Sequence, residues 1–389
     1  STMSALSFMQ VVVLYLIFQL LTSTSPAKKP FDILRKTVQT IASLKHRRDT
    51  MTTKKLGRQT VAFANPPSIA GHANVVGKKE GEGPLSASFD FINQDDTFGE
   101  ASFEKAESAM QRMALQNALD KAKQSAATLD YIFAGDLLNQ CIASSFAVRG
   151  QDIPFFGLYG ACSTMAESLT LAAMMLDGGF GEWCAAMASS HFCSAERQYR
   201  TPLEYGGQRT PTAQWTVTGA GAVVLAREGD GPYVTHATVG KIVDKGICDA
   251  NNMGAAMAPA AYESLTAHFS DTGRAPSFYD LIVTGDLGSL GREIVLDLFQ
   301  KDGVDLTNYD DCGCLIFDAQ AQDVHCGGSG CGCSAAVLTG YLLNGMREGK
   351  WKNLLFCGTG ALLSPTSSMQ GESVPGICHA VAISTQKGG

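Results

Sequence analysis

The sequence is poor in charge. Only 17% of its 389 residues are Asp, Glu, Lys or Arg, whereas 45% are hydrophobic, which excludes a largely disordered chain and provides for a large core. The sequence also has no basic excess. The net charge is −7, and residues 1–50 hold seven Lys or Arg and two Asp, a charge of +5 that leaves −12 for residues 51–389. An acidic body argues against nucleic acid as a partner.

Motifs for nucleotides and metals are missing as well. No Gly-Lys-Ser or Gly-Lys-Thr occurs, and the glycine runs at 219–221 and 328–332 lack the spacing of a dinucleotide fingerprint. The twelve cysteines are scattered, and the groups Cys312-x-Cys314 and Cys326-x4-Cys331-x-Cys333 do not match zinc-knuckle spacing. We therefore expect reduced thiols facing the cytosol, no nucleotide cofactor and no bound metal.

The longest hydrophobic run covers residues 6–21, no charge precedes Lys28, and seven basic residues follow by position 48. At about 1.5 Å per residue the run barely spans a ~30 Å hydrocarbon core. Without a basic segment before it, a cleaved signal peptide and secretion are not expected. Two interpretations stay open: residues 1–50 form a membrane anchor, or they are an extension foreign to the natural protein, because Met51 begins an ordinary start sequence.

The body is an internal duplication. Asp130-Tyr-Ile-Phe-Ala-Gly-Asp-Leu137 recurs as Asp280-Leu-Ile-Val-Thr-Gly-Asp-Leu287, 150 positions later, and a helix-period stretch precedes each copy. Cys162-Ser163 and Cys333-Ser334 each open a small-residue helix that leads into an apolar strand, at 183–189 and 354–359. The two halves are predicted to be residues 51–226 and 227–389.

Strands that alternate with helices indicate an α/β protein with parallel strands and crossover helices. The apolar segments 153–158 and 281–284 are expected to be strands buried on both faces. Two such halves packed together predict a layered α/β/α/β/α body with two mostly parallel sheets.

Polar groups are expected to gather where the parallel strands end. In open parallel sheets, ligands bind beyond the carboxyl ends of the strands. Asp136, Cys162, His191, Asp286 and the loop 327–333 all fall at such ends. A thiol at a helix N-terminus can have a lowered pKa, so Cys162 is a candidate nucleophile; the alternative is a small buried residue.

The other candidates also carry two interpretations. His191 is either a partner of Cys162 or a hydrogen-bonded structural histidine. Asp136 and Asp286 either bind a cation or cap helices. Arg197 and Arg200 either offer forked donors to a carboxylate or lie solvated on the surface.

Several motifs carry a resemblance to a known family. Gly160-Ala-Cys-Ser163 at a strand-to-helix elbow, the paired halves and Thr218-Gly-Ala-Gly-Ala-Val-Val-Leu225 are similar to the thiolase and ketoacyl-synthase superfamily. More closely, residues 51 to 385 resemble the stage V sporulation protein AD family of spore-forming bacteria. The stretches that carry this closer resemblance are 133–140, 158–168, 189–191, 195–200, 204–208, 257–261 and 360–365.

The departures from the superfamily bear on catalysis. Ketoacyl synthases of this fold pair the elbow cysteine with two second-half groups, His/His or His/Asn, that move protons and stabilise the oxyanion. Here Asp286 stands at the first of these positions and Ser329 at the second, and Thr218 stands where many relatives carry Asp. A carboxylate beside the elbow raises the pKa of the thiol and repels an enolate. We therefore expect no condensing activity.

The resemblance implies a function. Members of the family are implicated in moving dipicolinic acid (pyridine-2,6-dicarboxylate), with calcium, into the developing spore, together with stage V sporulation A membrane proteins. It implies a ligand in the thiolase-like cleft, a homodimer, and peripheral association with the spore inner membrane. The residues expected to form the ligand-binding site are Cys162, His191, Asp136, Asp286, Ser329, Arg197 and Arg200. The alternatives are an acyl-CoA condensing or transfer enzyme with Cys162 as nucleophile, and a structural scaffold of the membrane complex.

Overall fold

The computed structural model describes residues 54–199 and 209–388. Ten of its strands form two five-stranded blocks of one continuous sheet, one block from each half of the chain. The first block consists of β3 (Ser68–Val76), β5 (Tyr131–Gly135), β6 (Phe155–Leu158), β7 (Trp183–Ser190) and β9 (Gly219–Ala226). The second consists of β10 (Tyr233–Thr238), β11 (Leu281–Thr284), β12 (Tyr309–Asp311), β14 (Asn353–Ala361) and β15 (Gly376–Ser384).

The two blocks have the same topology. Their strand orders are β6-β5-β7-β9-β3 and β12-β11-β14-β15-β10. In each block three neighbouring strands are parallel and the fourth is antiparallel to the strands on both of its sides. Four of the five strands in each block therefore point the same way, as the duplication predicts. The blocks join where Tyr233 of β10 pairs with Ser68 of β3.

Short strands extend the edges of this sheet. β2 (Thr60–Ala62) pairs with both β10 and β1 (Lys55–Leu56), and β4 (Phe91–Ile92) pairs with β3.

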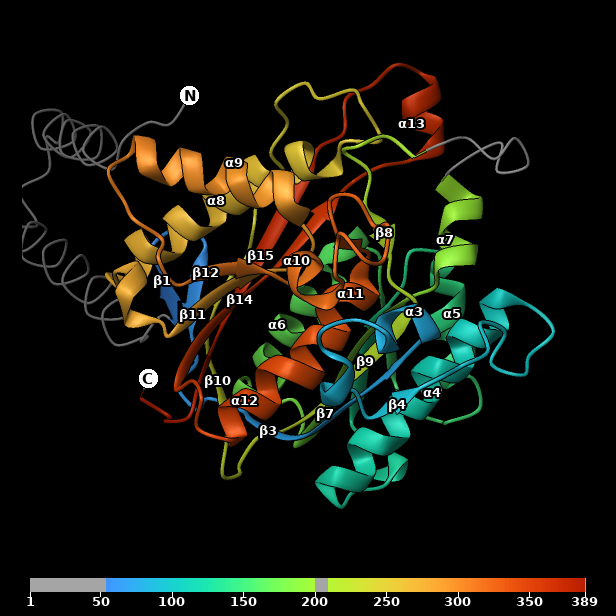
Figure 1. Cartoon of the computed structure of the whole chain (residues 1–389). Coiled ribbons are helices and arrows are strands. Elements are labelled where there is room, and N and C mark those ends of the chain that lie inside the picture. Colours follow the sequence, from blue (N-terminus) through green and yellow to red (C-terminus); the bar gives the residue numbers. More distant parts are fainter. Residues whose placement is uncertain (1–53, 200–208, 389) are drawn as a thin grey trace, which may run out of the picture. The chain divides into compact units, whose positions relative to one another are not determined.

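Helices form the remaining three layers (Figure 1). The helix α4 (Phe103–Ala122) covers β3 and β9 on one outer face, and α8 (Met253–Thr272) covers β14 and β15 on the other, with α9 (Gly288–Lys301) packed on it. Between the blocks lie α6 (Thr164–Asp177) and α11 (Cys331–Val337), which a π turn links to α12 (Leu343–Arg347). The shorter helices are α3 (Lys78–Gly81), α5 (Ile142–Val148), α7 (Phe192–Tyr199), α10 (Cys312–Ile316) and α13 (Pro365–Met369).

The repeated Asp of each half has the same structural role. The carboxylate of Asp130 accepts hydrogen bonds from the backbone N–H groups of Glu182 and Trp183, at 2.7 and 3.0 Å. The carboxylate of Asp280 accepts them from Lys352 and Asn353, at 2.7 and 2.8 Å. In both halves the residue before a parallel strand therefore fixes the start of the neighbouring strand, which explains why the sequence repeats there.

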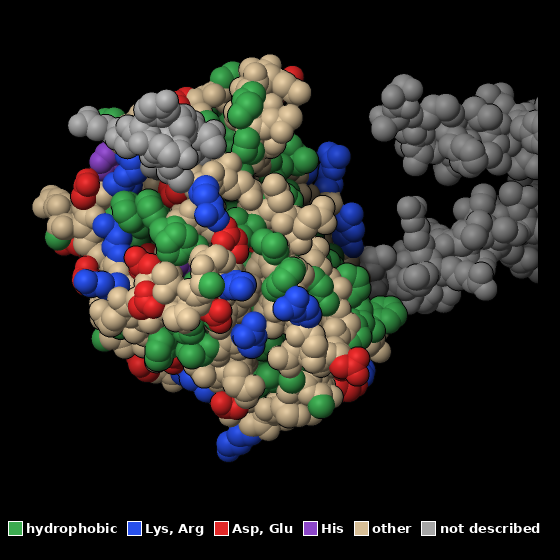
Figure 2. Space-filling view, turned by 90° about the vertical axis from the view of Figure 1, so that its right-hand side faces the viewer, with side chains coloured by type: hydrophobic (Ala, Val, Ile, Leu, Met, Phe, Trp, Pro, Cys, Tyr) green, Lys and Arg blue, Asp and Glu red, His purple; other side chains and the backbone are tan. Residues whose placement is uncertain are grey.

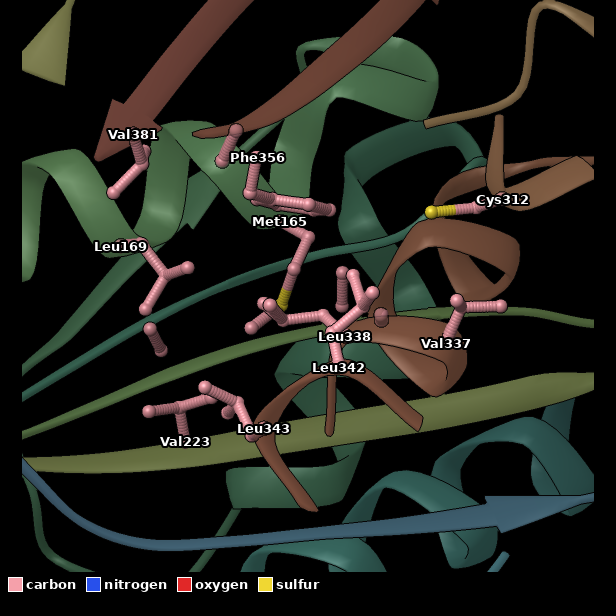
Figure 3. Packing of buried hydrophobic residues seen from close by; sticks show 14 of the residues in the cluster. Met165, Leu169, Val223, Cys312, Val337, Leu338, Leu342, Leu343, Phe356 and Val381 are labelled. Atoms are coloured by element: carbon pink, nitrogen blue, oxygen red, sulfur yellow. The ribbon is translucent and has the colours of Figure 1, made fainter. Parts of the chain in front are cut away.

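The largest hydrophobic cluster lies in the central layer (Figure 3). Met165 and Leu169 of α6, Leu338 and Leu342 of the π turn, and Phe356 of β14 are fully buried and point toward one another. Because these residues come from both halves, the two sheets share one core, and neither half can bury its inner face alone.

One strand differs from expectation. The strand β11 is buried, as predicted for residues 281–284, but β6 is an edge strand, and Phe156 on it is 47% exposed. The prediction of a strand buried on both faces at 153–158 was wrong, because β6 pairs only with β5. An apolar edge strand has the same hydrophobic pattern as a buried one.

One face of the described body mixes charged and hydrophobic side chains (Figure 2). Figure 2 shows acidic and basic side chains interspersed over one face of the described body, with hydrophobic side chains in small groups. Among residues 54–199 and 209–388, no helix has both the length and the apolar character required to cross a bilayer. The apolar run at 6–21 lies outside the described residues.

Candidate functional site

The thiol of Cys162 lies at a sharp turn between β6 and α6, on the single 3-10 turn Ala161–Ser163. The second-half strand β14 passes very close to this turn. A Cβ atom at Gly360 would lie 2.8 Å from the carbonyl oxygen of Gly160, and one at Gly358 would lie 2.6 Å from a side chain of α6. Glycine at these two positions therefore lets the second half approach the elbow and bring its own polar groups to Cys162.

Asp286, two residues beyond β11, is the group that the second half brings. Its carboxylate accepts hydrogen bonds from the Thr359 hydroxyl at 2.8 Å, from the Ser329 hydroxyl at 3.1 Å and from the Gly330 N–H at 3.0 Å. It also interacts electrostatically with the Cys162 thiol. The structure thus brings together three predicted site residues, Cys162, Asp286 and Ser329, at one point between the halves.

The electrostatics of this point disfavour a thiolate. Burial, and secondly the charge of Asp286, raises the pKa of the Cys162 thiol well above its ordinary value. Burial also raises the pKa of Asp286, although its hydrogen-bond donors oppose that shift. A protonated thiol is a weak nucleophile, so the arrangement is opposite to that of an activated catalytic cysteine.

A pocket of about 100 Å³, open to solvent on one side, lies beside Cys162. This volume is smaller than that of sites for drug-sized ligands. The described residues that line it come from both halves: Leu137, Ala161, Cys162, Ala195, Glu196, Tyr199, Ala213, Gln214, Thr216, Ala250, Asn251, Met253, Ser329, Ala361 and Leu363. Apolar residues predominate, and no Lys or Arg stands among these described lining residues.

A two-stranded parallel sheet forms one wall of the pocket. In it β8 (Trp215–Thr216) pairs with β13 (Gly328–Ser329). Because side chains alternate along a strand, Gln214 and Thr216 face the pocket whereas Trp215 points away from it. The Trp215 ring stacks on Phe192 with centroids 4.0 Å apart, and the ammonium of Lys79 lies 4.1 Å from its centroid. This stacking fixes the strand from behind.

His191 is placed away from the pocket. Its Nδ1 accepts a hydrogen bond from the Cys193 N–H at 3.2 Å, so the ring proton is on Nε2, which donates to the Asp96 carbonyl at 2.7 Å. Burial lowers the pKa of His191. Both ring nitrogens are occupied and the ring is neutral, so the geometry supports the structural interpretation of His191 rather than a Cys–His pair.

Asp136 also lies outside the lining. Its carboxylate accepts hydrogen bonds from the Leu138 N–H at 2.9 Å, the Ser144 N–H at 2.8 Å and the Ser144 hydroxyl at 2.6 Å. These bonds hold the turn after β5 and the first turn of α5, in keeping with the helix-capping alternative. Although Asp136 and Asp286 are repeat equivalents, only Asp286 reaches the elbow cysteine.

Of the two predicted arginines, Arg197 does not line the pocket. Arg197, on α7, forms an ion pair with Glu104 on α4, and its side chain is 57% exposed. Arg200 lies outside the described residues.

The cysteine groups at 312–314 and 326–333, whose spacing predicted no metal site, lie largely in the protein interior. Cys312, Cys331 and Cys333 are completely buried in the core. No cluster of three or more His, Cys, Asp or Glu with metal-binding geometry occurs in the part of the chain that the structure describes.

Five polar lining residues were not predicted from the sequence: Glu196, Tyr199, Gln214, Thr216 and Asn251. Gln214 precedes a two-residue strand, which is too short for a periodic signal, and Asn251 lies in an irregular loop. Glu196 and Tyr199 belong to a stretch that carried the family resemblance, and their three-residue spacing on a helix was the available signal.

Comparison with known proteins decides the family. The family model of stage V sporulation protein AD matches residues 57–384. The stage V sporulation protein AD of Bacillus subtilis strain 168 is 43% identical over 329 residues, which is 84% of this chain and 97% of that protein. The chain belongs to the stage V sporulation protein AD family.

Solved structures place this family member in a wider fold. 3-Oxoacyl-[acyl-carrier-protein] synthase III from Aquifex aeolicus VF5 matches with a TM-score of 0.52 and 14% identity, over 82% of this chain and 99% of that one. A single-residue variant of OleA from Xanthomonas campestris matches with a TM-score of 0.55 and 16% identity, over 85% of this chain and 98% of that one. Identities this low show the fold alone, and that fold is the predicted duplicated, thiolase-like α/β architecture.

Membership of the stage V sporulation protein AD family supports a role in sporulation. The pocket lies between the two halves, beside Cys162. Burial, and secondly the charge of Asp286, disfavours a thiolate at this point.

Proposed function

We propose that this protein binds dipicolinic acid in the pocket above Cys162, without catalysing a reaction, and supports uptake of the acid into the developing spore. In this proposal it works at the spore inner membrane, peripherally, with the other stage V sporulation A membrane proteins. The observation that carries the proposal is the Asp286 carboxylate beside the buried Cys162 thiol, because it disfavours a thiolate at a site that keeps a pocket. The ligand is the one that the family resemblance implies.

The pocket suits a small, flat ligand. Its walls are largely apolar, as an aromatic ring requires, and polar side chains are confined to a few points such as Gln214, Asn251 and Ser329. Backbone N–H groups near the start of α6 are candidate partners for a carboxylate. The described lining holds no Lys or Arg that could neutralise a dicarboxylate. Calcium carried by the ligand would neutralise the negative charge of the ligand and so reduce its repulsion by Glu196.

Calorimetry on the full chain tests the binding. Dipicolinate should give saturable heat, and Leu363→Trp should weaken it at least about tenfold, because Leu363 lines the pocket and is partly exposed. The matched control is Met369→Trp, which is 77% exposed on the neighbouring helix α13 and does not line the pocket. Equal affinity in both variants, or no heat at millimolar ligand, contradicts the proposal.

The Arg197→Ala variant tests the expectation from the sequence. Since Arg197 pairs with Glu104 outside the described lining, unchanged affinity would assign carboxylate recognition to the pocket itself. A loss of affinity would assign part of it to α7.

A second candidate function is acyl transfer from Cys162. The observation in its favour is the fold, because the matched structures include a synthase and a cysteine-to-serine variant of OleA with bound lauric acid and lauroyl-CoA. The assay is carbon–carbon bond formation from acetyl-CoA and malonyl-CoA. Turnover that disappears in Cys162→Ser would establish the enzyme and overturn the non-catalytic proposal. A scaffold without a ligand remains the outcome if neither assay responds.

A further inference from the structure

The pocket wall contains a buried amide whose orientation is fixed by its neighbours. Gln214 is 2% exposed, and its Nε2 donates to the carbonyl oxygens of Asp286 at 2.7 Å and Gly328 at 2.8 Å. Rotating the amide would set its oxygen against two carbonyl oxygens, so Nε2 must face them. Among the described residues, nothing donates to the Gln214 Oε1, which leaves one buried acceptor without a partner on a residue that lines the pocket.

The space around Gln214 is closely built. Gly288 has a φ of +66°, and a Cβ atom there would lie 2.4 Å from the Cys326 carbonyl and 2.9 Å from the Gln214 Nε2. Glycine at this position therefore leaves room for the amide, and the amide cannot easily turn away. A buried polar atom without a partner is costly, so a fixed one beside a ligand pocket calls for a ligand group.

The surrounding hydroxyl groups are already committed as donors. The Ser329 hydroxyl donates to Asp286 at 3.1 Å, and the Thr216 hydroxyl donates to Glu196 at 3.2 Å. The Tyr199 hydroxyl donates to the Leu137 carbonyl at 2.8 Å. These hydroxyl groups can therefore only accept hydrogen bonds from a ligand. The wall around Gln214 thus presents mainly hydrogen-bond acceptors.

We propose that Gln214 is a specificity-determining residue: its Oε1 accepts a hydrogen bond from an O–H or N–H donor of the ligand, so the pocket selects ligands that carry such a donor. The identity of the ligand as an aromatic diacid rests on the proposed function, whereas the acceptor is a property of the pocket. A fully deprotonated dicarboxylate has only acceptors, and it must therefore bring a donor. Water bound to a chelated divalent cation and a protonated carboxyl group are the two sources of that donor.

The experiment compares three probes by calorimetry on the full chain: dipicolinate with a chelator, dipicolinate with equimolar calcium, and pyridine-2,6-dicarboxamide, which supplies N–H donors. The calcium chelate and the diamide should bind about tenfold more tightly than the calcium-free acid. Binding of the calcium-free acid should take up a proton, measured in buffers of different ionisation enthalpy. Proton uptake on binding of the calcium-free acid would identify a protonated carboxyl group as its hydrogen-bond donor. The absence of proton uptake with the calcium chelate would identify the metal-bound water as the donor there.

Gln214→Met removes the acceptor and should weaken the chelate and the diamide about tenfold, the range of one hydrogen bond at most. The matched control is Gln111→Met. Gln111 is also fully buried, donates from Nε2 to Ser144 and Ser189, and has an unpartnered Oε1, but it does not line the pocket.

The outcomes separate the two proposals. Three results would each overturn the role of Gln214. The first is equal affinity of Gln214→Met and the wild type, and the second is an equal loss of affinity in Gln111→Met. The third is a preference for the calcium-free acid without proton uptake. Binding of the diamide but of neither form of dipicolinate would support that role and overturn the proposed function. Binding of no probe at millimolar concentration would overturn both.

Discussion

The thiol of Cys162, from the first half of the chain, lies beside the carboxylate of Asp286, from the second half. Both groups are buried, and three further donors fix the carboxylate in place. The duplication is what makes this contact possible, because each residue follows a strand of its own half. The turn at Cys162 keeps the shape of a thiolase-like elbow, but the neighbouring carboxylate raises the pKa of the thiol instead of lowering it.

The first prediction concerns the reactivity of this thiol. Because burial and Asp286 raise its pKa, Cys162 should react with iodoacetamide at pH 8 at least about 100-fold more slowly than the exposed Cys248. Asp286→Asn removes the negative charge and should speed the modification of Cys162 about tenfold, roughly one pKa unit. Peptide mass spectrometry measures both rates within one sample.

Cys248 serves as the internal control for reagent and time. Modification of Cys162 in the wild type at the rate of Cys248 would contradict the prediction. A faster rate in Asp286→Asn counts only if its melting temperature stays above the assay temperature, because unfolding would expose every thiol.

Only part of this site was predictable from the sequence. The repeat of Asp130 and Asp280 predicted the duplicated halves, and the resemblance to ketoacyl synthases implied that Asp286 would stand beside Cys162. Gln214 and the partner of His191 were not predictable. The ring of His191 bonds to the carbonyl of Asp96, 95 positions away, and no local pattern encodes a contact with a backbone atom.

The second prediction concerns the homodimer implied by the resemblance. The edge strand β6 pairs only with β5, and Phe156 on β6 and Phe146 on the neighbouring α5 are 47% and 45% exposed. An apolar sheet edge is a site for pairing with a second strand, so we expect two copies to associate there. Phe156→Asp should convert a dimer to a monomer, measured by light scattering after size-exclusion chromatography.

Phe180→Asp is the matched control, because Phe180 is 67% exposed but lies in the turn between α6 and β7. A dimer that persists in Phe156→Asp, or that is lost equally in Phe180→Asp, would show that β6 is not the interface.

The third prediction concerns the N-terminal extension. The family match begins at residue 57, and the repeats are complete within the described residues. A chain that starts at Met51 should therefore fold and melt within about 2 °C of the full chain. Differential scanning calorimetry measures this, and a fall of about 10 °C or more would show that residues 1–50 contribute to the fold.

The fourth prediction concerns stability against pH. Glu107 is 1% exposed, and burial, followed by the charge of Asp136, raises its pKa to about 8 from an ordinary value of 4.5. The native state thus binds a proton that the unfolded chain has lost. The stabilisation is complete below about pH 4.5 and is lost as the pH rises through about 8.

Glu107→Gln is neutral at every pH and removes this loss. Between about pH 5 and pH 8 the free energy of unfolding of the wild type should therefore fall relative to Glu107→Gln, on the order of 3 kcal/mol, measured by urea denaturation. Buried histidines such as His72 and His268 act with the opposite sign and at lower pH, because burial lowers the pKa of each to about 3. They are present in both proteins and cancel in the difference.

The control is Glu182→Gln, because Glu182 is an exposed carboxylate paired with Arg227, and this variant should follow the wild type. Parallel profiles of the wild type and Glu107→Gln would mean that Glu107 is ionised in the folded protein, and that its two serine donors, Ser189 and Ser194, compensate for burial.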